Sequence, residues 1–146
     1  MQKIHPFLWF DTQAEEAANF YVSIFRNSKI TDTMRNNGSV LTVGFTLDGT
    51  DFTALNGGPL FKFTEAVSFV VDCRDQEEVD YYWDKLLAGG TPSQCGWLKD
   101  KYGLSWQVVP KRLIELLQDK DKARAARVMQ AMMKMVKIDV KTLEEA

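Results

Sequence analysis

The 146-residue chain is 45% hydrophobic and 26% charged, the composition of a globular protein with one domain or two small modules that share a core. Its net charge of −2 provides no overall attraction to nucleic acid or to an acidic membrane surface. No apolar run approaches the ~20 residues of a membrane span and no signal-peptide pattern opens the chain. We therefore expect a cytoplasmic protein with no membrane partner.

Charge is unevenly distributed along the chain. Residues 1–110 hold nine Lys and Arg against fourteen Asp and Glu, whereas residues 111–141 hold nine against four. We expect this basic region to be a C-terminal extension that packs on an acidic body; the alternative is an arm that contacts nucleic acid. Cys73 and Cys95 form no CxxC pair, so we expect two reduced thiols rather than a disulfide.

The first half of the chain predicts the order β-α-β-β-β. A short apolar strand over residues 4–10 is interrupted by Pro6, which favours an edge or bulge position. A helix over residues 13–25 follows, for which Asp11 and Thr12 offer N-cap oxygens. Asn-Asn-Gly and Asp-Gly turns then separate three further strands: 29–35, 39–47 and 51–55.

The second half repeats this order. The glutamate pairs in the first turns of the two helices, Glu15-Glu16 and Glu77-Glu78, lie 62 residues apart, which indicates an internal duplication. We expect one module over about residues 1–60 and a second over about 61–110. The elements predicted for the second module are a strand over 65–72, a helix over 75–88, a strand over 91–97 and a hairpin within 95–110.

The hairpin 95–110, CGWLKDKYGLSWQVVP, turns at Gly103, a residue suited to positive φ. We expect Asp100 and Lys101, beside the turn, to be exposed and paired with each other. Strand alternation divides the second half of the hairpin into one face with Ser105, Gln107 and Val109 and another with Leu104, Trp106 and Val108. Polar groups on a sheet face need water or a ligand beside them, so this hairpin is predicted to form one wall of a cavity.

Residues 111–146 have helical character. A short helix is predicted over 113–117, a longer one over 121–136, and a final short turn after Thr142. The longer helix contains a methionine stripe within AMMKM. We expect this stripe to be core or a subunit contact, with an adaptable binding surface as the alternative.

Four motifs together resemble the PhnB-like family, described as 3-demethylubiquinone-9 3-methyltransferase, within the vicinal oxygen chelate (glyoxalase/bleomycin-resistance/dioxygenase) superfamily. They are PFLWFDTQAEEAANFYVSIF, FTALNGGPLFKF, CGWLKDKYGLSWQVVP and VMQAMMKMVKIDV. The resemblance implies an α+β fold of two βαβββ modules whose curved sheets enclose a cavity, here followed by a helical extension over 111–146. It also implies a homodimer.

The resemblance further implies a divalent metal held by His or Glu on the first strand of each module and by a Glu near the end of the last strand. In this chain the last-strand position is Gln107, a neutral amide. The candidate ligand positions on the first strand of the second module are Ala66 and Ser68. His5 is the only histidine and the single candidate ligand. A catalytic metal needs about three protein ligands, so we expect no metal and no other cofactor.

Methyl transfer is not predicted by the residues. A methyl donor is usually held by a Gly-rich turn between a strand and a helix. Here Gly57-Gly58 follows a predicted strand and Gly89-Gly90 follows a predicted helix, without that context.

Aromatic residues and small amides or hydroxyls on predicted strands suit a small organic ligand. The expected cavity residues are Trp9, Asn56, Ser68, Trp97, Ser105 and Gln107, with Trp106 assigned either to the cavity or to the core. The sequence therefore predicts a protein that binds a small organic molecule without a catalytic metal. The alternatives are a metal-assisted glyoxalase- or dioxygenase-like enzyme and a regulator that contacts nucleic acid through residues 111–141.

Overall fold

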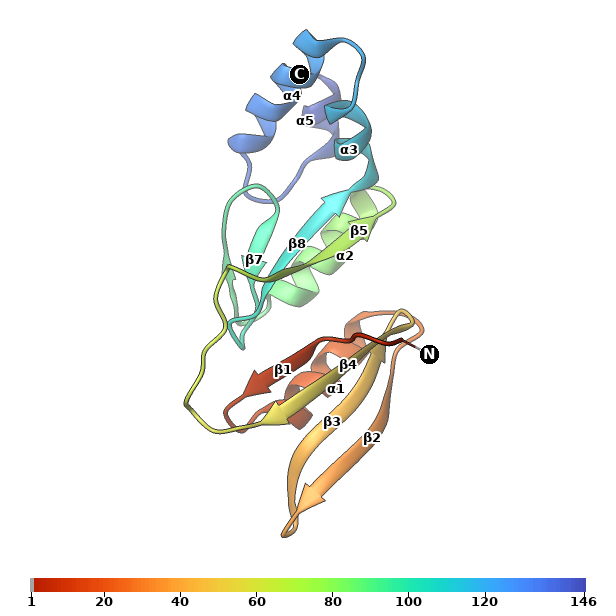
Figure 1. Cartoon of the computed structure of the whole chain (residues 1–146). Coiled ribbons are helices and arrows are strands. Elements are labelled where there is room, and N and C mark those ends of the chain that lie inside the picture. The colour runs from red at the N-terminus through yellow and green to blue at the C-terminus, as the bar shows by residue number, and fades with distance from the viewer. Residues whose placement is uncertain (1) are drawn as a thin grey trace. The chain divides into compact units, whose positions relative to one another are not determined.

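The computed structural model describes residues 2–146, which divide into two compact units, one up to Phe63 and the other Thr64–Ala146. Each unit contains a four-stranded open sheet with one helix packed on it (Figure 1). The two sheets have equivalent strand orders, β1-β4-β3-β2 and β5-β8-β7-β6. The α+β prediction of two βαβββ modules is therefore confirmed. Within residues 2–146 no helix is both long and apolar enough to cross a membrane.

The first unit follows the predicted order closely. Its elements are β1 (Phe7–Phe10), α1 (Ala14–Ile24), β2 (Lys29–Asn36), β3 (Ser39–Leu47) and β4 (Thr50–Asn56). Strand β1 pairs with β4 in parallel, and the remaining pairs are antiparallel. The first strand begins at Phe7 rather than at residue 4, because Pro6 has no N–H; its carbonyl instead accepts from Thr53 N at 3.0 Å.

The core of the first unit lies between α1 and the sheet. Ala17 and Ala18 are fully buried, and their small side chains let the helix approach β3 and β4 closely. Tyr21 stacks on Phe45, which stacks in turn on Phe52. The apolar face expected from the helical spacing is therefore the face that the sheet covers.

The second unit has shorter central strands than the first. Its elements are β5 (Ser68–Cys73), α2 (Gln76–Leu87), β6 (Thr91–Pro92), β7 (Trp97–Lys99) and β8 (Ser105–Pro110). Asp75 caps α2, its carboxylate accepting from Glu78 N at 3.0 Å. The prediction of one strand over residues 91–97 is wrong, because residues 93–96 form a turn in which Cys95 and Gly96 have positive φ.

The C-terminal extension takes up the hydrogen-bonding groups of that turn. Cys95 N donates to Met135 O at 2.8 Å, and Gly96 N donates to Val136 O at 2.7 Å. The extension contains α3 (Lys111–Leu117), α4 (Lys122–Met133) and α5 (Val140–Glu144), so the predicted long helix ends three residues early. These helices share a small core of their own: Leu113, Leu116, Val128, Ile138 and Leu143.

The methionine stripe divides between core and surface. Met132 and Met135 pack against the core of the extension. Met129 and Met133 are 40% and 57% exposed. Within AMMKM the core interpretation therefore holds for Met132 and Met135 and not for Met133.

Candidate ligand site

The open face of the β5-β8-β7 sheet carries four of the six predicted cavity residues. Val71, Leu98 and Val108 are buried on the face that α2 covers (Figure 1). Side chains alternate along a strand, so on each of the three strands the residues at the alternate positions point to the opposite face. They include Ser68, Trp97, Ser105 and Gln107. The register places Ser68 opposite Ser105 and Trp97 opposite Gln107, which brings the four into one patch.

Gln107 is the centre of this patch. Its amide nitrogen donates to Ser68 Oγ at 2.9 Å, a bond between β8 and β5. Gln107 Oε1 accepts no hydrogen bond from any residue of the described chain. The amide is half-buried, so an acceptor and a second N–H donor remain open to a molecule on this face.

Ser105 has an unusual environment for a hydroxyl. The residue is 1% exposed, and within residues 2–146 its Oγ has no hydrogen-bond partner. A buried hydroxyl without a partner is costly, and such groups are rare in proteins. Ser105 lines a hollow of about 240 Å³, whose other lining residues are Glu65, Thr91, Pro92, Ser93, Trp97, Leu98 and Lys99.

An ion pair lies in the same hollow. Lys99 Nζ is 3.1 Å from Glu65 Oε1, and the two side chains are 42% and 65% exposed. The hydrogen bond from Lys99 and its positive charge lower the pKa of the Glu65 carboxyl. The hollow therefore combines a cation, a carboxylate, a hydroxyl and an indole.

The other two predicted cavity residues lie in the first unit. Trp9 is on β1, and its Nε1 donates to Gly58 O at 2.9 Å. The indole is in edge contact with Phe61 and packs directly over Gly57, where a Cβ would come within 2.5 Å of the ring. Trp9 is thus held by the segment that follows β4.

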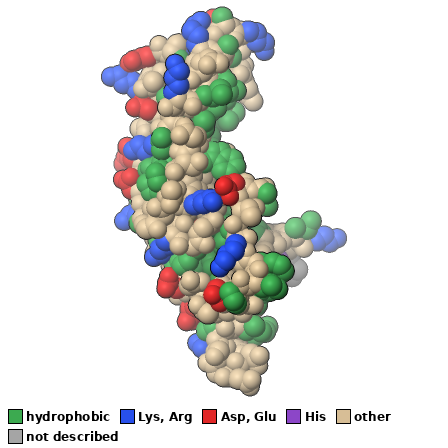
Figure 2. Space-filling view, turned by 90° about the vertical axis from the view of Figure 1, so that its left-hand side faces the viewer, with side chains coloured by type: hydrophobic (Ala, Val, Ile, Leu, Met, Phe, Trp, Pro, Cys, Tyr) green, Lys and Arg blue, Asp and Glu red, His purple; other side chains and the backbone are tan. Residues whose placement is uncertain are grey.

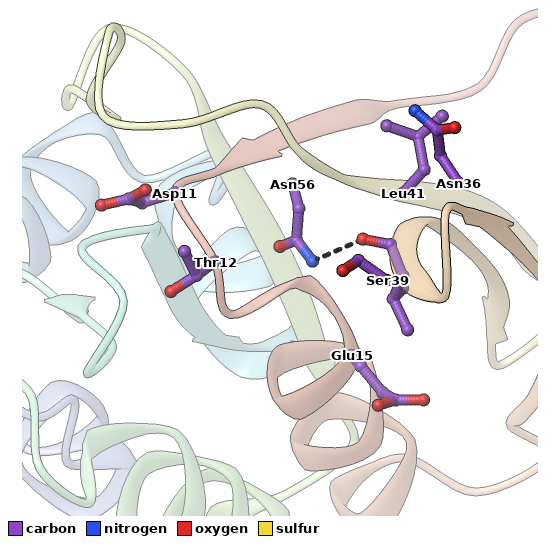
Figure 3. A pocket seen from close by; sticks show the side chains of 8 residues that line it. Asp11, Thr12, Glu15, Asn36, Ser39, Leu41 and Asn56 are labelled. Carbon is purple, nitrogen blue, oxygen red and sulfur yellow. Dashed lines mark hydrogen bonds between the residues drawn. The ribbon is translucent and has the colours of Figure 1, made fainter.

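Asn56 lines an open hollow of about 550 Å³ together with Asp11, Thr12, Glu15, Asn36, Ser39, Val40 and Leu41 (Figure 3). Its Oδ1 accepts from Ala14 N at 2.8 Å, and its Nδ2 donates to Val40 O at 3.1 Å. Both ends of the amide are therefore engaged in joining β4 to α1 and β3.

The N-terminus of α1 differs from the prediction. Asp11 and Thr12 were expected to cap the helix, but the N-cap position is Gln13, which makes no side-chain capping bond. Asn56 supplies the oxygen instead, from a strand 42 residues along the chain. The first-turn N–H groups of a helix need an acceptor, and here a long-range one provides it.

Asp100 also differs from the prediction. It was expected to be exposed beside the turn, but it is 3% exposed. Its Oδ1 accepts from Tyr102 N and Leu104 N at 2.9 and 3.1 Å, and its Oδ2 accepts from Trp106 Nε1 at 2.9 Å. Asp100 thus organises the β7-β8 turn, and Trp106 belongs to the core. In the sequence, an Asp placed just before a Gly-containing turn was the signal that could have indicated this role of Asp100.

The residues present do not fit the divalent metal that the resemblance implies. His5 is exposed, and its Nε2 lies 3.0 Å from Thr53 Oγ1. Across the described chain no group of three or more His, Cys, Asp and Glu side chains is placed to hold a metal ion. Gln107 and Ser68, at the positions expected for ligands, are bonded to each other.

The two cysteines are free thiols in different environments. Cys73 ends β5 and is 1% exposed. Burial, followed by the charges of Glu78 and Asp72, raises the pKa of its thiol to about 12. Cys73 is therefore unsuited to act as a nucleophile near neutral pH. Cys95 is half-buried in the turn that the extension contacts.

The basic extension is partly neutralised by its own carboxylates. Arg112 Nε is 3.2 Å from Glu144 Oε1, and Arg124 is 3.6 Å from Asp119. Figure 2 shows basic, acidic and hydrophobic side chains interspersed over the C-terminal helices at the top of that view. The face shown there has no continuous positive stripe of the kind typical of nucleic-acid binding.

The family model described as 3-demethylubiquinone-9 3-methyltransferase matches residues 2–109. The PhnB protein of Bacillus cereus is 37% identical, with a TM-score of 0.70, over 75% of this chain and 99% of that one. A search of curated proteins gave no match. The extension after residue 109 lies outside the family match.

Two more distant structures share the fold. A Pseudomonas aeruginosa protein is 14% identical, with a TM-score of 0.64, over 75% of this chain and 98% of that one. The Listeria monocytogenes fosfomycin resistance protein, complexed with Mn(II) and sulfate, is 18% identical, with a TM-score of 0.58, over 81% of this chain and 98% of that one. The chain therefore belongs to the PhnB-like family described as 3-demethylubiquinone-9 3-methyltransferase and has the glyoxalase/bleomycin-resistance fold.

Proposed function

We propose that the open face of the β5-β8-β7 sheet binds a small organic molecule without a catalytic metal. The observation that carries the proposal is Ser105, a fully buried hydroxyl that has no partner within the described chain and lines a hollow. A ligand atom that bonds Ser105 Oγ would remove the cost of the unmade hydrogen bond.

The neighbouring residues supply the other elements of a small-molecule site. Trp97 offers an apolar ring on which a planar group can pack, and Gln107 offers a free carbonyl oxygen. The lining combines three apolar residues, Pro92, Trp97 and Leu98, with charged and hydroxyl groups, and such polar groups can fix the orientation of a ligand. The first-unit hollow is less suitable, because the amide of Asn56 is already engaged with α1 and β3.

The methyl transfer named in the family description is not part of the proposal. The strand-to-helix turns of this chain are residues 11–13 and 74–75, and neither contains glycine. A methyl donor would therefore lack the close backbone approach that such turns give.

A fragment library screened by ligand-observed NMR tests the proposal. Fragments that bind the unchanged protein should bind the Ser105→Ala and Gln107→Ala variants more weakly, because each substitution removes one hydrogen-bonding group from the site. Ser39→Ala, in the first-unit hollow, is the matched control and should bind as the unchanged protein does. Fragments that bind equally to all four proteins, or no fragments that bind, would refute the site.

A further inference from the structure

We infer that the molecule bound at this site carries a carboxylate or a similar anionic group that Lys99 binds, and that Glu65 holds that position in the free protein. The inference rests on the proposed function, since it concerns the same hollow. It starts from the ion pair between Lys99 Nζ and Glu65 Oε1, 3.1 Å apart, inside the lining of that hollow.

Several of the groups that line the hollow can donate hydrogen bonds. Lys99 contributes an ammonium with three N–H bonds, and Ser105 contributes an O–H. The indole N–H of Trp97 makes no hydrogen bond with any residue of the described chain. Donors on residues that line one hollow suit a group that only accepts hydrogen bonds, and an ionised carboxylate is such a group.

The register places these donors close together. Lys99 on β7 lies directly opposite Ser105 on β8, and Thr91 on β6 lies opposite Lys99. The Cα atoms of directly opposed residues in an antiparallel pair are about 5 Å apart, so the side chains of Lys99 and Ser105 leave the same part of the sheet face.

The carboxylate partner is held less firmly than the cation. Glu65 lies before β5, outside the sheet, and is 65% exposed, whereas Lys99 is anchored in β7 and is 42% exposed. Exposed ion pairs are weak, so a ligand anion with additional contacts to Trp97 and Ser105 can displace Glu65 from Lys99. The Glu65 carboxylate thereby acts as an internal competitor for an anionic ligand.

This arrangement predicts charge effects of opposite sign. Glu65→Gln removes the competitor and should raise the affinity for an anion about two- to five-fold, the range expected for an exposed ion pair. Lys99→Gln removes the cation and should lower the affinity for an anion by a similar or larger factor. Neither change should alter the affinity for a neutral molecule of the same shape.

The probes are 2-naphthoate and its neutral amide, 2-naphthamide, titrated by NMR at low and at high salt. Naphthoate should bind more tightly than naphthamide, and its advantage should shrink at high salt. Glu77→Gln and Lys85→Gln, on α2 at the other face of the sheet, are matched charge controls and should leave both affinities unchanged.

The outcomes separate the two proposals. If both probes bind equally, or if only neutral fragments bind, the inference about the anion is wrong while the ligand site stands. If Glu65→Gln weakens naphthoate binding, the role of Glu65 as a competitor is refuted. If neither these probes nor any library fragment binds in the unchanged protein, the proposed function itself fails.

Discussion

Trp106 Nε1 donates a hydrogen bond of 2.9 Å to Asp100 Oδ2, so the last strand of the second unit is tied to the turn that precedes it. The other carboxylate oxygen of Asp100 accepts from two backbone N–H groups of the same turn. Because β8 carries both Ser105 and Gln107, this buried network sets the position of the strand on which the proposed site is built.

We predict that Asp100→Asn lowers the free energy of unfolding by about 1–3 kcal/mol, because an amide nitrogen cannot accept from Trp106 Nε1. Urea unfolding followed by tryptophan fluorescence measures the change. Trp106→Phe is the partner variant, and the double variant should cost less than the sum of the two single changes. Strictly additive costs would show that the Asp100–Trp106 bond does not contribute.

In the first unit, we predict that Asn56→Ala lowers the free energy of unfolding by about 1–3 kcal/mol. The substitution leaves Ala14 N and Val40 O without their partner, and it removes the acceptor that caps α1. Urea unfolding followed by circular dichroism is the measurement. Ser39→Ala lines the same hollow and is the control, with an expected change below about 0.5 kcal/mol. An equal loss in both variants would contradict the capping role.

The sequence was sufficient for the order of elements and for the faces of β8. Side-chain alternation depends only on neighbouring positions, which is why Ser105 and Gln107 could be assigned to one face and Trp106 to the other. The start of α2 was predictable to within one residue because its N-cap, Asp75, acts locally, whereas the capping oxygens expected for α1 were wrong.

Long-range hydrogen bonds were not predictable in this way. Asn56 caps a helix that begins 42 residues earlier, and no local pattern indicates such a partner. The turn at Cys95 and Gly96 replaces part of a strand because carbonyl groups of the extension accept its N–H groups. Asp100 was assigned to the surface because charged residues are rarely buried, and its three donors appear only when the turn is folded.

We predict that stability falls above about pH 9 partly through Cys73. The folded protein holds the pKa of this thiol at about 12, against an ordinary value of 9.0, so the unfolded chain loses its proton first. Below pH 9 the thiol is protonated in both states and the full stability is present; as the pH rises from 9 towards 12, ionisation of the unfolded chain lowers the free energy of unfolding.

The measurement is urea unfolding of the unchanged protein and of Cys73→Ala between pH 7 and pH 10.5. Cys73→Ala should be less stable at pH 7, because it leaves a small cavity, and the difference between the two proteins should narrow as the pH rises. A difference that stays constant over this range would mean that the thiol ionises with an ordinary pKa in the folded protein.

The last prediction concerns Gln76, which joins α2 to the extension outside the family match. Its Oε1 accepts from Val140 N at 2.7 Å and its Nε2 donates to Ile138 O at 3.0 Å. Gln76→Ala removes both bonds and should lower the free energy of unfolding by about 1–3 kcal/mol. Hydrogen exchange should accelerate first at the N–H groups of α5, which the Gln76 side chain holds on α2. Glu77→Ala, the next residue on the same helix, is the control and should leave this exchange unchanged. Equal protection of α5 in all three proteins would show that the two bonds of the Gln76 side chain do not hold α5 in place.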